Sequence, residues 1–81
     1  MFFVRTANFG GSMKIIDTKT LGETIRARRK ELKYTQAYLS EFTGISVSFI
    51  SDLENGKPTV EFEKTLTILH VLGMDLLVEK R

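Results

Sequence analysis

The spacing of apolar residues along the chain predicts four helices followed by one strand. The first helix spans residues 20–32, with Leu21 and Ile25 repeating at the interval of one helical face. Thr20 and Glu23 have the spacing of a capping box, in which each side chain bonds the other residue's backbone N–H. We therefore expect this helix to begin at Thr20 and to bury one apolar face.

Two short helices follow within residues 35–57 and are joined by a tight turn. Thr35 and Ser46 are residue types that cap helix starts, and Gly44 tolerates the left-handed backbone of a bend. Leu39 and Phe42 are expected on one face of the first helix; the second carries Phe49, Ile50 and Leu53. Two short helices with a glycine at the bend are typical of a helix-turn-helix, whose second helix enters the DNA major groove. The alternative is a plain helical hairpin whose polar face meets water.

The fourth helix is expected to begin near Pro58-Thr59, with Thr59 as its cap, and to end at Gly73. It carries two apolar stripes: Phe62, Leu66 and Leu69 form the first, and Ile68, Val71 and Leu72 form the second. An isolated domain needs only one such stripe, so the second predicts a surface for self-association.

Residues 74–80 alternate with an imperfect period of two, which predicts a strand. A single strand leaves its backbone donors unpaired, so we expect it to pair with the same strand of a second copy. The competing partner is the Phe-rich start, from Phe2 to Arg5, in the same chain or in another. The residues expected at the dimer interface are Ile68, Val71, Leu72, Met74, Leu76, Leu77 and Val78. A two-fold dimer would place two recognition helices about one DNA turn apart, which matches a palindromic site.

Residues 1–12 differ in composition from the rest of the chain. They contain three Phe and end in Gly10-Gly11-Ser12, which has the composition of a flexible linker. We expect an N-terminal extension or leader at 1–12 and a helix-turn-helix domain at 13–81. The alternative is an arm that pairs with a partner or reaches along DNA.

Composition limits the function classes. The 81 residues make one domain, and the lack of cysteine excludes disulfides and thiolate metal sites. No apolar run approaches the roughly 18 residues of a membrane span, so we expect a cytoplasmic protein without a membrane partner. There is no glycine-rich phosphate loop, and His70 has no carboxylate or cysteine at ligand spacing. We therefore expect no enzyme activity, no cofactor and no metal.

The charge is unevenly distributed, although the net charge is only +2. Residues 1–34 carry eight Lys or Arg and three Asp or Glu, a balance of +5. Residues 35–81 carry four Lys or Arg and seven Asp or Glu, a balance of −3. A basic region beside the recognition helix suits contacts with DNA phosphates.

The motifs resemble those of one family. They are Leu21-Gly22-x-x-Ile25-x-x-x-Arg29, Thr35-Gln36, Gly44-Ile45-Ser46 and Phe49-Ile50-Ser51-x-Leu53-Glu54-x-Gly56-Lys57. Over about three-quarters of its length the chain resembles the Xre/phage-repressor class of helix-turn-helix domains. Ser40 departs from the pattern, because the class normally has Ala where the two helices touch.

This resemblance implies a mainly α-helical, lambda-repressor-like fold of four to five helices, with a C-terminal strand that pairs across a dimer. The ending, Leu72-Gly73-Met74-Asp75-Leu76-Leu77-Val78-Glu79, is similar more narrowly to HipB-like antitoxins. Those are small dimeric proteins that bind DNA, neutralise a HipA-type kinase toxin and repress their own operon. The implied partners are double-stranded DNA with a palindromic operator, a second copy and a kinase toxin.

The expected DNA contacts fall into two groups. The resemblance implies that Gln36 binds a DNA phosphate, as the matching glutamine of the family does, and Thr35, Asn55 and Lys57 are expected to make further contacts with the DNA backbone. Toward the bases, the helix presents Ser46, Val47, Ser48 and Ser51. Serine hydroxyls both donate and accept and so contact bases with little selectivity, whereas Val47 suits a thymine methyl group.

Two further residues have structural roles that the resemblance implies. Arg29 pairs with Glu54 and so joins the first helix to the end of the recognition helix. Phe49 stays open between a core or interface position and a wedge that faces DNA. The alternative functions are a stand-alone Xre regulator, a restriction-system controller, and a protein-interaction module without DNA binding.

Overall fold

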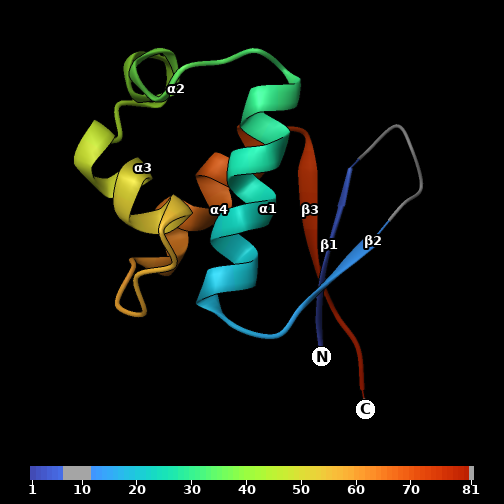
Figure 1. The fold of residues 1–81 in the computed structure, drawn as a ribbon. Coiled ribbons are helices and arrows are strands. Elements are labelled where there is room, and N and C mark those ends of the chain that lie inside the picture. Colours follow the sequence, from blue (N-terminus) through green and yellow to red (C-terminus); the bar gives the residue numbers. More distant parts are fainter. Residues whose placement is uncertain (7–11, 81) are drawn as a thin grey trace.

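A computed structural model of the chain describes residues 1–6 and 12–80 and contains four helices and a small sheet (Figure 1). In chain order the elements are β1 (Phe2–Thr6), β2 (Ser12–Ile15), α1 (Thr18–Glu31), α2 (Gln36–Thr43), α3 (Val47–Glu54), α4 (Phe62–Val71) and β3 (Met74–Val78). The expected mainly helical fold of four helices is confirmed. The sheet lies on one side of α1 and α4, and α2 and α3 lie on the other side (Figure 1).

α1 begins two residues earlier than expected. Its N-cap is Asp17, whose carboxylate accepts from the backbone N–H of Thr20 at 2.7 Å. The hydroxyl of Thr20 is bonded back to the Asp17 backbone and so completes the capping box. The predicted box of Thr20 and Glu23 is therefore wrong, because an aspartate three residues upstream takes the capping position and Thr20 acts as its partner.

The caps of the two short helices are as predicted. The Thr35 hydroxyl accepts from the backbone N–H of Tyr38 at 2.9 Å, and the Ser46 hydroxyl accepts from that of Phe49 at 3.1 Å. Gly44 between the helices has a φ of 77°, in the left-handed region. Thr35 therefore sets where α2 begins, Gly44 where it ends, and Ser46 where α3 begins.

Phe42 does not lie on the buried face of α2 with Leu39. Leu39 is fully buried, whereas Phe42 is 66% exposed and stacks on Tyr38, with 6.2 Å between ring centroids. Tyr38 in turn contacts Tyr34 at 4.9 Å. The expectation fails because α2 is only two turns long and buries a single apolar residue, so Phe42 packs along its outer side.

α4 begins at Phe62, with Glu61 in the cap position and no side-chain hydrogen bond there. The predicted cap at Thr59 is wrong. Pro58 and Thr59 form a turn instead, and Val60 then packs against the core before the helix begins. Because Val60 packs against the core before the helix, α4 begins later than predicted.

The sheet has the order β2-β1-β3, and both pairs are antiparallel. Phe2 lies between Ile15 of β2 and Val78 of β3 in the register. β3 therefore pairs within its own chain, with the Phe-rich start that was the competing partner. β2 was not expected, because it has only four residues and one of its apolar side chains, Met13, is 58% exposed.

Residues 2–6, from the expected leader, thus supply the middle strand of the sheet, and Val4 is buried in the core at 2% exposure. The predicted Gly10-Gly11 part of the linker lies outside the described residues. The division of the chain at residue 12 stays a prediction.

One continuous core fills the space between the sheet and the helices. Its buried apolar residues are Val4, Ile15, Ile25, Leu39, Ile45, Ile50, Leu53, Ile68, Leu69, Leu72 and Met74. α1 and α3 approach each other at Gly22, where a Cβ would lie 2.4 Å from the carbonyl oxygen of Leu53. A glycine at this position is therefore what allows α3 to pack so closely on α1.

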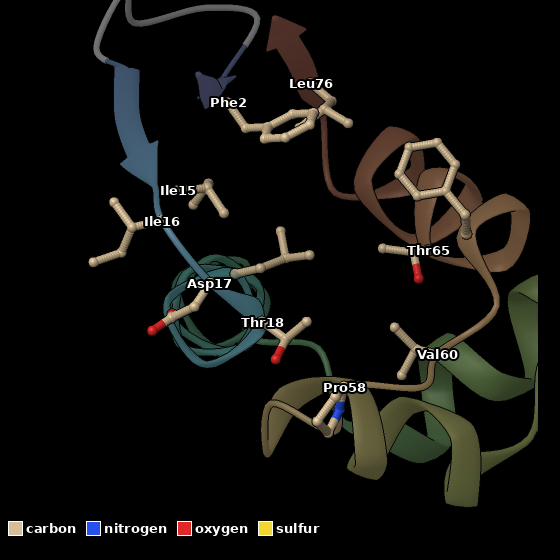
Figure 2. Close-up of a pocket in the computed structure, with 11 residues that line it drawn as sticks. Phe2, Ile15, Ile16, Asp17, Thr18, Pro58, Val60, Thr65 and Leu76 are labelled. Atoms are coloured by element: carbon tan, nitrogen blue, oxygen red, sulfur yellow. The ribbon is translucent and has the colours of Figure 1, made fainter.

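An apolar groove opens beside this core, between the sheet, the start of α1 and the start of α4 (Figure 2). Phe2, Ile15 and Leu76 line it from the sheet, and Val60 and Thr65 line it from the opposite side. Within the described residues, the helices are all too short or too polar to cross a membrane.

Candidate nucleic-acid interface

Arg29 and Glu54 form a buried ion pair that joins α1 to the end of α3. Arg29 Nε donates to Glu54 Oε2 at 2.6 Å, and Arg29 Nη2 donates to Glu54 Oε1 at 2.9 Å. Arg29 Nη1 donates to the carbonyl oxygen of Tyr34 at 2.8 Å. The hydrogen bonds to Glu54 raise the pKa of Arg29 above its ordinary value. The pairing that the resemblance implied is present, and its two parallel bonds fix the position of α3 against α1.

Gln36, at the start of α2, belongs to the same network. Its Nε2 donates to Glu54 Oε1 at 3.1 Å, and the side chain is half-buried. Glu54 therefore accepts bonds from α1 and α2 while it belongs to α3. One amide N–H of Gln36 is not used by this bond, so the expected phosphate contact stays compatible with the network and remains a prediction.

α3 has a buried side and a solvent side. Ile50, Leu53 and Glu54 are buried, whereas Ser46, Val47 and Ser48 at the other end are exposed. These three residues come together at the start of the helix, as the sequence pattern predicts. The exposed side chains are small, so the helix backbone can approach the floor of a groove about 12 Å wide.

Ser51 and Asn55 lie further along the same helix and contact each other. Asn55 Nδ2 donates to Ser51 Oγ at 3.5 Å, and Ser51 is half-buried while Asn55 is exposed. Ser51 therefore lies at the flank of the exposed surface. Its expected contact with a base and the expected phosphate contact of Asn55 stay predictions.

Asp52 is absent from the DNA contacts expected from the sequence, although its side chain is 46% exposed. Lys57 Nζ lies 3.4 Å from Asp52 Oδ2, so the expected phosphate-binding lysine is paired with this carboxylate. The signal that points to Asp52 is its spacing of four residues from Ser48, which places both on one side of the helix.

Phe49 packs on the core and is half-buried. Lys64 Nζ of α4 lies 5.6 Å from the centroid of its ring, within the range of a cation–π contact. Phe49 therefore takes the core position and not that of a wedge facing DNA.

Three of the residues expected at a dimer interface are inside the core of a single chain. Ile68 and Leu72 are fully buried, and Met74 is 2% exposed. Their apolar surface is thus covered within one chain, without a second copy. Val71, Leu76 and Leu77 are half-buried, and Val78 is 69% exposed.

His70 is exposed. Among the described residues, no group of three His, Cys, Asp or Glu side chains is arranged to hold a metal ion.

Comparison with known proteins gives the same family as the geometry. Residues 25–78, about two thirds of the chain, match the family model described as helix-turn-helix. The chain belongs to the Xre-like helix-turn-helix family. As a member of this family it is a DNA-binding protein of the transcription-regulator type.

Two relatives support this assignment of the helix-turn-helix chain. An uncharacterized HTH-type transcriptional regulator, y4mF of Sinorhizobium fredii, is 39% identical over 56 residues, which cover 69% of this chain and 74% of that protein. The ImmF control region 10 kDa protein of Bacillus phage phi105 is 32% identical over 66 residues, which cover 82% of this chain and 73% of that protein. No solved structure matches the chain significantly.

Proposed function

We propose that this helix-turn-helix protein is a sequence-specific repressor that binds a palindromic operator as a dimer. The observation that carries the proposal is the start of α3, where Ser46, Val47 and Ser48 are exposed while the Arg29–Glu54 pair holds the other end of the helix. A helix that exposes small residues at its start and is fixed at its other end has the form that the major groove accepts.

The dimer would form through the free edge of β3. Met1 and Glu79 exchange two backbone hydrogen bonds, at 2.7 and 2.9 Å, so they are a hydrogen-bonded pair of the β1–β3 ladder. Because such pairs alternate along an antiparallel ladder, Leu77 and Asp75 also bond β1, and the backbone groups of Leu76 and Val78 point away from it. A second β3 can bond these outward groups, which supports an isologous dimer.

The finer part of the proposal is that the protein is the antitoxin of a HipA-type kinase toxin and represses their common operon. Its support is the resemblance of residues 72–79 to the ending of HipB-like antitoxins. The test is affinity purification of the chain, co-expressed with the genes that flank its own. Recovery of a kinase-like protein supports the antitoxin role, whereas its absence leaves a stand-alone regulator, which would act in the cytoplasm in the same way.

DNA binding is tested by placing negative charge on the solvent side of α3. In the variant with Ser46→Asp and Ser48→Glu, Asp keeps the N-cap that Ser46 supplies, so the helix start is preserved. The matched control is Lys14→Glu, which changes the net charge by the same two units on β2. We expect the double variant to lose binding to its own upstream DNA in a gel shift and the control to keep it. Equal binding by both variants would exclude α3 as the DNA-contacting helix.

A further inference from the structure

We infer that Asp52 selects the base at one position of each half-site, by accepting a hydrogen bond from the amino group of a cytosine. This inference rests on the proposed function and names a base contact within the proposed DNA-binding surface. It follows from where Asp52 lies on α3, from what a carboxylate can and cannot bond, and from the lack of another role for this side chain.

The direction of Asp52 follows from helix geometry. At roughly 100° per residue, Ser48 and Asp52 both point within about 20° of the direction opposite to Ile50. Ile50 is fully buried in the core, so Ser48 and Asp52 lie along the line of α3 that faces most directly outward. A helix that enters the groove at Ser48 therefore brings Asp52 to the bases about one turn further along.

Helix stability does not explain an aspartate at this position. Asp52 lies in the last turn of α3, where the helix dipole disfavours a negative charge, and aspartate is a poor helix former. Its only side-chain hydrogen bond or ion pair among the described residues is with Lys57, at 3.4 Å, and both side chains are about half exposed. A pair of this kind adds little to folding stability.

A carboxylate at the base edges is selective because it only accepts hydrogen bonds. Guanine presents two acceptors in the major groove and thymine presents one acceptor and a methyl group, so both repel or fail to bond it. Adenine offers an amino group beside the N7 acceptor, whereas cytosine offers its N4 amino group without an adjacent acceptor. Cytosine is therefore the base that Asp52 fits best.

Lys57 reduces the repulsion between the Asp52 carboxylate and the DNA phosphates. An isolated carboxylate in the groove would be repelled by the DNA backbone, but the ammonium group 3.4 Å away offsets its charge. Lys57 Nζ donates to Oδ2 of Asp52, and no hydrogen bond to the other carboxylate oxygen is found in the described part of the chain. That oxygen is available to a base, and Lys57 acts as a positioning residue.

The test is selection of binding sites from a randomised DNA library by the wild type and by Asp52→Asn. An amide suits the N6 and N7 atoms of adenine, so we expect one position in each half-site to change from cytosine to adenine, with the other positions unchanged. Binding of Asp52→Asn to the wild-type site should weaken about tenfold. The control is Glu63→Gln, which removes an exposed carboxylate on α4 and should leave the selected sequence unchanged.

The other outcomes overturn the inference. If the wild type and Asp52→Asn select the same sequence, Asp52 contacts no base. If Asp52→Asn binds all sequences more tightly by the same factor, Asp52 acts only by charge repulsion. In both cases the wild type still selects a motif and the proposed function stands. A wild type that selects no motif overturns the proposed function and this inference together.

Discussion

At the scale of single residues, the Arg29–Glu54 pair controls how the DNA-contacting surface is held. Glu54 accepts three hydrogen bonds, two from Arg29 and one from Gln36. Arg29 also bonds the carbonyl oxygen of Tyr34 in the connection to α2. All three helices that frame the candidate interface thus meet at one buried carboxylate.

We predict that removing one partner of this pair costs more stability than removing both. Arg29→Met or Glu54→Met leaves an unpaired charge in the core, which costs about 3–5 kcal/mol, whereas the double variant leaves none. The measurement is the free energy of unfolding in urea for the wild type, both single variants and the double variant. Additive losses would show that the pair is not coupled and would contradict its role.

Asp17 gives the start of α1 a pH dependence. Hydrogen bonds from the backbone N–H and hydroxyl of Thr20 hold the pKa of Asp17 below its ordinary value of 3.8. Because the folded-state pKa is lowered, the charged cap stabilises the fold above pH 3.8 and loses this effect as the pH falls through the lowered pKa.

We therefore predict that Asp17→Asn melts at a lower temperature than the wild type at neutral pH, and that the difference shrinks below pH 3.8. Asparagine keeps a capping oxygen but carries no charge for the helix dipole. The difference is measured by thermal melts followed by circular dichroism between about pH 2 and about pH 7, a range that spans the ordinary pKa of an aspartate. Glu23→Gln is the control. A difference that stays constant down to the lowest pH would contradict the prediction.

At the scale of elements, local residue chemistry was enough to predict the centre of the chain. The helix caps at Thr35 and Ser46 and the left-handed turn at Gly44 depend only on the neighbouring backbone. They can therefore be predicted from the local sequence. The solvent side of α3 is predictable for the same reason, since its helical period separates Ile50 and Leu53 from Ser48.

The sheet was predictable only in part, because strand pairing depends on residues far apart in the chain. β3 was recognised as a strand, but its alternation fits a copy of itself as well as it fits Phe2–Thr6. β2 has too few apolar residues to be detected alone, and it forms because β1 offers it a paired edge. At the site, Asp52 is not among the DNA contacts expected from the sequence, because those on the helix were assigned to its small side chains and not to the line opposite Ile50.

Since β1 is the middle strand, we predict that Val4→Asp unfolds the domain. Val4 is 2% exposed, so the variant would bury an unpaired carboxylate at a cost of several kcal/mol. The control is Arg5→Ala on the same strand, which removes only an exposed pair at 4.0 Å from Asp75. The melting temperature should fall strongly for Val4→Asp and little for Arg5→Ala. Equal melting of the two would mean that residues 2–6 are not part of the core.

At the scale of the whole molecule, the sheet and α3 lie on opposite sides of α1 and α4 (Figure 1). The free edge of β3 is thus separate from the candidate DNA surface. The proposed repressor requires that its dimer leave α3 of each copy uncovered, and pairing through this edge is expected to meet that requirement.

We predict that Val78→Pro abolishes the dimer and leaves the monomer folded. The backbone N–H of Val78 points to the free edge, so proline removes a donor to the second copy without removing a bond to β1. Val78→Ala is the matched control, because it shortens the same exposed side chain and keeps the N–H. Sedimentation equilibrium should show a dimer for wild type and control and a monomer for Val78→Pro. A monomeric wild type, or a dimeric Val78→Pro, would contradict pairing through β3.

The central claim is that the solvent side of α3 contacts DNA, and an NMR titration tests it most directly. Backbone amide shifts of the protein are recorded while a DNA fragment obtained by binding-site selection is added. We predict that the largest changes occur at residues 46–52, with further changes at Thr35, Gln36 and Lys57. If the largest changes occur on β1, β2 and β3 while residues 46–52 stay unchanged, α3 is not the DNA-contacting helix.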